Sequence, residues 1–94
     1  MNKLRWSPNA EDAYLAILEY LAEAKGISFA MQLDKQVELL AEHLRNFDKL
    51  CPPSIIEPLL RKCVIGKNYA LLYQVDKQGI EVLMFFDNRS DVRY

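Results

Sequence analysis

The sequence lacks the features that mark secreted or membrane-spanning proteins. No uninterrupted apolar run exceeds a handful of its 94 residues, whereas a membrane-spanning helix needs about 20. The N-terminal segment has no long apolar stretch and no small-residue cleavage site, so we expect no secretory signal. The sequence therefore predicts a cytoplasmic protein without a membrane partner.

Metal-ligating side chains are also scarce, with only two cysteines and one histidine. Cytosolic proteins rarely keep disulfides, so we predict that Cys51 and Cys63 are free thiols and that Cys63 is an inert apolar strand residue. Two cysteines and one histidine at these spacings cannot complete a four-ligand site. We therefore expect no metal and no cofactor.

An excess of charge of one sign is missing as well. The net charge is −1, so the whole protein produces no field that would attract nucleic acid. Residues 1–50 carry six Lys/Arg against eight Asp/Glu, and residues 58–94 carry six against four, which leaves a weak basic bias in the second half. The length predicts one domain over residues 1–94.

Two helices are predicted in the first half from apolar residues repeated at spacings of three and four. Ser7-Pro8 is a strong helix start, because serine caps free amides and proline suits the first turn. Gly26 is a plausible C-cap, Ser28 can start the second helix, and Cys51-Pro52-Pro53-Ser54 lies beyond its end. The two apolar stripes are Ala10, Ala13, Tyr14, Ile17, Leu18, Leu21, Ala24, and Phe29, Leu33, Val37, Leu40, Leu44, Phe47.

The apolar period changes to two in the second half, which predicts three strands linked by hairpins. The expected strands are 59–65, 69–75 and 80–86, with turns at Gly66-Lys67 and 76–79. A short strand at 3–6 should join the sheet at an edge or beside the neighbour of the last strand. The predicted fold is α+β, in the order β-α-α-β-β-β, with a twisted antiparallel sheet packed against a helical hairpin.

Four stretches of the sequence carry a family resemblance. They are "RWSPNAEDAYLAILEYLAE", "LLRKCVIGKNYALLYQV", "GIEVLMFF" and "DNRSD". In order, they resemble the opening strand and helix, the central hairpin, the last strand and the closing polar motif of the RelE/ParE superfamily of bacterial type II toxins. The resemblance covers nearly the whole chain.

The resemblance implies a partner and one of two activities. A cognate antitoxin would wrap the toxin with an extended or helical tail. ParE-like members poison DNA gyrase, and RelE-like members cut mRNA in the ribosome without a metal. We expect a ParE-like toxin that acts by binding; the alternatives are a RelE-like endoribonuclease and an inactive relative that only binds antitoxin. We expect oligomers only with the antitoxin or as a weak homodimer.

The ribonuclease alternative depends on cationic side chains, because cleavage needs a base, an acid and cations around the phosphate. The resemblance implies catalytic roles for Arg61, Arg89 and Tyr94. Cys63 and Ala70 stand where such enzymes carry further cations. Whether the chain is an enzyme therefore stays open, and the vacant positions favour a toxin that is not.

Five further residues are candidates for binding: Lys62, Lys67, Tyr69, Tyr73 and Asn88. The two lysines could replace the missing cations, or they could be ordinary solvent-exposed residues. The two tyrosines share one strand face and could stack on a base, but packing within the sheet is the favoured interpretation.

The closing motif has two interpretations. Asp87 and Asn88 favour a turn that ends the strand. Arg89 then either pairs with Asp87 or Asp91 in a plain exit loop, or lies beside Arg61 at a shared rim that could bind an anion. The second interpretation requires the two arginines to lie at the same end of the sheet.

Overall fold

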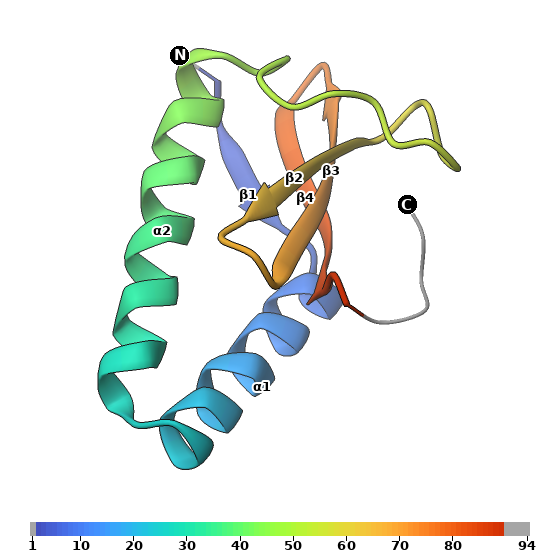
Figure 1. The fold of residues 1–94 in the computed structure, drawn as a ribbon. Coiled ribbons are helices and arrows are strands. Elements are labelled where there is room, and N and C mark those ends of the chain that lie inside the picture. The colour runs from blue at the N-terminus through green and yellow to red at the C-terminus, as the bar shows by residue number, and fades with distance from the viewer. Residues whose placement is uncertain (1, 90–94) are drawn as a thin grey trace.

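In the computed structural model, which describes residues 2–89, two helices pack against one face of a four-stranded sheet (Figure 1). The elements are β1 (Leu4–Trp6), α1 (Pro8–Ala24), α2 (Ile27–Asn46), β2 (Arg61–Ile65), β3 (Tyr69–Asp76) and β4 (Gly79–Asp87). This confirms the predicted order β-α-α-β-β-β and the α+β class.

The predicted start of α1 is confirmed, and the predicted joint between the helices is shifted by one residue. The Ser7 Oγ accepts a hydrogen bond from the Ala10 N–H at 3.1 Å, which satisfies a free amide of the first turn. Lys25 is the C-cap of α1, and Gly26, at a φ of 109°, is the N-cap of α2. A joint of two residues makes the helices a tight hairpin.

The apolar stripes bury part of their residues against the sheet and leave others exposed. Leu33, Val37 and Leu44 of α2 are buried, as predicted. The prediction is wrong for Phe29 and Phe47, which are 50% and 66% exposed. The hairpin end of α2 extends beyond the sheet (Figure 1), and Phe47 follows the last helical residue, so neither side chain reaches the core.

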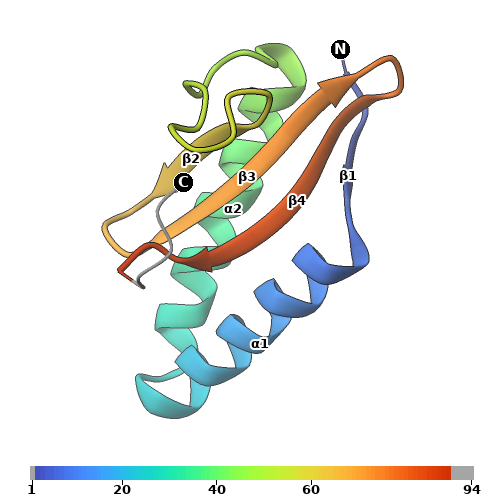
Figure 2. The same cartoon turned by 90° about the vertical axis from the view of Figure 1, so that its right-hand side faces the viewer.

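The sheet has the strand order β1-β4-β3-β2 (Figure 2). The three later strands form the predicted antiparallel meander, whereas β1 pairs in parallel with β4 at the edge, which makes the sheet mixed. The Lys3 carbonyl accepts the Ile80 N–H at 2.8 Å, and the Val82 carbonyl accepts the Ser7 N–H at 2.8 Å. These bonds fix the N-terminus against the last strand.

Aromatic rings join the sheet to α1. The Tyr14 ring centroid lies 4.8 Å from that of Phe85 and 5.2 Å from that of Trp6. Tyr69 also stacks on Phe85, with ring centroids 6.1 Å apart. Such aromatic pairs add stability beyond the area that they bury, and Trp6 packs in this cluster.

The second strand is shorter than predicted, because residues before Arg61 form a turn. The Leu60 N–H donates to the Glu57 carbonyl, and the Leu60 carbonyl accepts the Ser54 N–H, both at 2.8 Å. Leu59, predicted to begin the strand, is 93% exposed. The segment 47–60 is therefore a folded connection between α2 and β2.

Candidate functional surfaces

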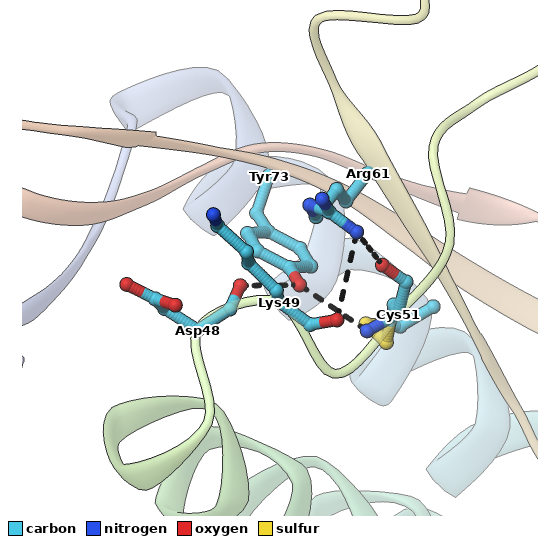
Figure 3. The surroundings of a disulfide bond; sticks show 6 residues. Asp48, Lys49, Cys51, Arg61 and Tyr73 are labelled. Carbon is cyan, nitrogen blue, oxygen red and sulfur yellow. Dashed lines mark hydrogen bonds between the residues drawn. A yellow bond between two sulfur atoms is a disulfide. The ribbon is translucent and has the colours of Figure 1, made fainter.

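A disulfide between Cys51 and Cys63 joins the 47–60 connection to β2 (Figure 3). The prediction of free thiols is wrong. The chain leaves α2, turns back and runs beside β2, which brings the two Cα atoms to 5.3 Å, within the range that a disulfide requires. Spacing in the sequence gives no sign of this contact.

Tyr73 of β3 holds the same connection from inside the core. Its hydroxyl donates to the Asp48 carbonyl at 2.8 Å and accepts the Cys51 N–H at 3.3 Å. Burial raises the pKa of the Tyr73 hydroxyl. Because the side chain has 0% exposure, it offers no surface on which a base could stack.

The Arg61 side chain points toward the 47–60 connection and not toward a rim shared with Arg89. One of its terminal nitrogens donates to the Cys51 carbonyl at 2.7 Å and reaches the Lys49 carbonyl at 3.5 Å (Figure 3). Together with Tyr73 and the disulfide, this half-buried guanidinium fastens the start of the connection to the sheet.

Arg89 lies at the other end of the meander from Arg61. Arg61 pairs with Tyr73, whereas Asp87, which ends β4, pairs with Tyr69. The two positions are four residue steps apart along β3, or about 13 Å at 3.3 Å per residue. The predicted shared rim is therefore wrong. In a meander, β2 and β4 run in the same direction, so the start of one and the end of the other lie at opposite ends.

Within the residues that the structure describes, the chain after β4 is an exit loop in which Arg89 pairs with Asp87. The Arg89 Nε and a terminal nitrogen donate to the two Asp87 carboxylate oxygens at 3.1 and 2.8 Å. The hydrogen bond from Arg89 lowers the pKa of Asp87 below its usual value. The pair closes the turn on itself. Asp91, the other predicted partner of Arg89, lies outside the described residues.

The remaining candidates are scattered. The Lys62 ammonium lies 5.9 Å from the Phe86 ring centroid, and Lys67 is exposed in the β2–β3 turn. Tyr69 is half-buried in the aromatic cluster, and burial followed by the charge of Asp87 raises the pKa of its hydroxyl.

Asn88 contributes its backbone to the sheet, and the other predicted site residue, Tyr94, is not described. The Asn88 backbone N–H donates to the Asn68 carbonyl at 2.6 Å, which extends the β3–β4 pairing. Tyr94 lies outside the described residues. The predicted catalytic and binding residues therefore do not converge within residues 2–89.

The sequence reasoning missed a groove between α1 and α2. One hollow, of about 550 Å³, is lined by Leu18, Glu19, Ala22, Ile27, Ala30, Met31, Gln32, Asp34, Lys35 and Glu38. A second, of about 530 Å³, is lined by Trp6, Glu11, Tyr14, Asp34, Val37, Glu38, Ala41, Glu42 and Arg45. The sequence signal was the recurrence of exposed apolar and acidic residues on α2, off the predicted core stripe.

Asp34 and Tyr14 join the two helices within this groove. The Tyr14 hydroxyl donates to the Asp34 Oδ1 at 2.6 Å. Burial, and then the hydrogen bond to Asp34, raise the pKa of the Tyr14 hydroxyl well above its usual range. The tyrosine therefore stays neutral and acts as a donor across the helix pair.

Loss of the Tyr73 hydroxyl should loosen the 47–60 connection. We expect Tyr73→Phe to lower the free energy of unfolding by roughly 1–3 kcal/mol, because it leaves the Asp48 carbonyl and the Cys51 N–H without this partner. Urea denaturation measures the change. The matched control is Tyr20→Phe, since Tyr20 is 63% exposed. Equal effects of the two changes would contradict the fastening role.

Neither a metal cluster nor a membrane-spanning element is found in the described part of the chain. No three His, Cys, Asp or Glu side chains of residues 2–89 come close enough to hold a metal ion. No helix there is sufficiently long and apolar to cross a bilayer.

The chain resembles known proteins along nearly its whole length. A family model described as the ParE toxin of the type II toxin–antitoxin system parDE matches residues 4–92. A solved structure from the chromosomal ParDE toxin–antitoxin system of P. aeruginosa is similar in fold, with a TM-score of 0.79 at 16% identity. The match covers 93% of this chain and 96% of that chain. No curated protein sequence matches the chain.

Proposed function

Because this chain belongs to the ParE toxin family of type II toxin–antitoxin systems, we propose that it stops growth by binding a target such as DNA gyrase. We propose further that a cognate antitoxin neutralises it. The family match over residues 4–92 carries the proposal. The similar fold of a ParDE system agrees with the proposal. A shared fold alone does not carry a function, so the family match is the main support.

The placement of the arginines favours binding over RNA cleavage. Phosphoryl transfer needs cations that surround one phosphate, and loss of a single well-placed group commonly costs about 10²–10³ in rate. Arg61 is engaged with backbone carbonyls, and Arg89 is engaged with Asp87 at the opposite end of the meander. These two arginines therefore do not form the cationic pair that the ribonuclease alternative requires.

The 47–60 connection supports a toxin that acts by contact with another protein. Ile55 and Leu59 are 90% and 93% exposed, while the disulfide, Tyr73 and Arg61 hold the connection in place. Apolar side chains held at a surface cost little further entropy when a partner covers them. This arrangement is typical of a binding protein.

Expression of the chain alone should halt growth with a DNA-damage response and intact mRNA, and co-expression of the antitoxin from the neighbouring gene should restore growth. Purified chain should inhibit DNA supercoiling by gyrase. Codon-dependent mRNA cuts would overturn the proposed mechanism in favour of the ribonuclease. Harmless expression would overturn it in favour of an inactive relative.

Arg89→Ala should leave toxicity within about threefold of the wild type, measured as colony counts after induction. The side chain is exposed and pairs only with the neighbouring Asp87 among the residues that the structure describes, so its loss should not unfold the protein. A ribonuclease that uses this cation should lose about 10²–10³ in activity. Lys77→Ala, another exposed cation, is the matched control.

A further inference from the structure

A hollow of about 870 Å³ lies where the start of β1, the end of α2 and the β3–β4 turn come together. Of the described residues that line it, four carry a positive charge and none carries a negative charge. The full chain, in contrast, has a net charge of −1. We call this surface the basic hollow, and its lining is Asn2, Lys3, Leu4, Arg5, Arg45, Lys77, Gln78 and Gly79.

Backbone hydrogen bonds hold the three walls of the basic hollow together. The Lys3 carbonyl accepts the Ile80 N–H at 2.8 Å, which fixes the start of β1 to β4, and Figure 2 shows the start of β1 beside the β3–β4 turn. The Asn2 N–H donates to the Arg45 carbonyl at 2.9 Å, which joins the same segment to the last turn of α2. Side chains on a backbone that is already fixed lose less freedom when they bind a ligand.

The carboxylates next to the basic hollow are engaged with two of its lining residues. Asp76 and Glu81 lie 2.8 and 3.7 Å from the Arg5 guanidinium. The Asp48 Oδ2 accepts a hydrogen bond from the Asn2 Nδ2 at 3.2 Å. These contacts balance the charge of Arg5, so the capacity of the hollow to bind an anion depends on its other cations.

Three cations of the basic hollow keep their charge for a ligand. None of the ion pairs and side-chain hydrogen bonds within residues 2–89 engages Lys3, Arg45 or Lys77. The two lysines are exposed, and Arg45 is half-buried. The Asp76 carboxylate accepts the Gln78 N–H at 2.8 Å, which orders the turn that carries Lys77. Because the three cations come from three different segments, they gather at one hollow and do not follow a line along the surface.

This lining suits phosphate groups. Arginine offers a planar pair of N–H donors that matches phosphate oxygens, and lysine adds a point charge. Three cations match a ligand with several negative charges. Among the described residues, the lining has no aromatic side chain on which a base could stack, and Leu4 is its one large apolar residue. Such a ligand would be recognised through its phosphates.

We propose that the basic hollow binds a small ligand that carries a chain of phosphates, through Lys3, Arg45 and Lys77. Its volume lies within the range of about 300–1,000 Å³ that is usual for sites of small ligands. The inference goes beyond the proposed function, because it adds a ligand site to a protein that we propose to act by binding other proteins.

The test is calorimetric titration of the purified chain with inorganic triphosphate, at low salt and without divalent cations. The wild type should bind, and the affinity should fall as salt is added. Lys3→Ala/Lys77→Ala should weaken binding at least roughly tenfold, because two charge-assisted contacts are lost. The matched control is Lys35→Ala/Lys67→Ala, which removes two exposed lysines outside the hollow lining. The control should bind within about threefold of the wild type.

Arg45→Gln tests the third cation and should also weaken triphosphate binding roughly tenfold. Because Arg45 is half-buried, thermal denaturation of this variant is compared with that of the wild type. Lys3→Ala/Lys77→Ala changes only exposed side chains, so circular dichroism should show an unchanged fold. The lysine variant therefore tests the site even if Arg45→Gln unfolds.

A comparison of ligands identifies the group that the basic hollow recognises. ATP should bind within about threefold of triphosphate, and AMP, with one phosphate, at least roughly tenfold more weakly than ATP. Equal binding of AMP and ATP would overturn the proposal. The same holds if the wild type does not bind triphosphate, or binds it no more tightly than Lys3→Ala/Lys77→Ala. A short DNA duplex that binds more tightly than triphosphate, and loses its affinity in the same variant, would overturn it in favour of a nucleic-acid surface.

Discussion

Reduction of the Cys51–Cys63 disulfide should lower the free energy of unfolding by about 3 kcal/mol. The bond closes a loop whose ends are 12 positions apart, and the chain-entropy model gives about that value for a loop of this size. For a domain of this length, the loss corresponds to a fall in melting temperature of about 12–24 °C. Thermal and urea denaturation with and without dithiothreitol measure it.

The reduced wild type isolates the bond itself, because both sulfur atoms remain in place. Cys51→Ala/Cys63→Ala should lose at least as much stability and should not respond to dithiothreitol. Both cysteines are buried, at 8% and 2% exposure, so this variant adds a packing defect. A wild type whose denaturation midpoint is unchanged by reduction would show that Tyr73 and Arg61 suffice to hold the connection.

The disulfide also changes how the target-binding proposal can be tested. The disulfide holds the 47–60 connection, with the exposed Ile55 and Leu59, against β2. If the target binds these side chains, reduction of the disulfide should weaken gyrase inhibition. Gyrase inhibition measured with and without dithiothreitol tests this expectation.

The secondary structure was predictable because its signals are local. Ser7-Pro8 fixes the start of α1, and Gly66 and Gly79 mark the two hairpin turns. The error at Leu59 arose because an alternating pattern does not reveal the hydrogen bonds of a turn. Those bonds join Leu60 to Ser54 and to Glu57 and form once the connection has folded back.

The candidate site was less predictable, because the wrong predictions concern contacts between residues that are far apart in the sequence. No local signal pairs Cys51 with Cys63 or aims Arg61 at the Cys51 carbonyl. The separation of Arg61 from Arg89, in contrast, follows from the meander alone, since β2 and β4 run in the same direction. The groove depends on the angle between two helices, which apolar spacing does not fix.

Gly79→Ala should cost roughly 2–4 kcal/mol of stability and detach β1 from the sheet. Gly79 has a φ of 118°, which an L side chain rarely adopts, and a Cβ here would overlap the Lys3 carbonyl oxygen. That oxygen accepts the Ile80 N–H at 2.8 Å and so holds β1 beside β4. Urea denaturation gives the loss, and hydrogen exchange at the Ile80 amide should report the detachment.

Gly26→Ala separates backbone strain from this overlap. Gly26 has a similar φ of 109°, but a Cβ at this position meets nothing within 4 Å. Its substitution should cost about 1–2 kcal/mol from strain alone and should leave the Ile80 amide protected. Because the overlap in Gly79→Ala involves backbone atoms that cannot rotate away, its cost should exceed that of Gly26→Ala. Equal costs would mean that β1 shifts without loss, and that its parallel pairing with β4 contributes little to the fold.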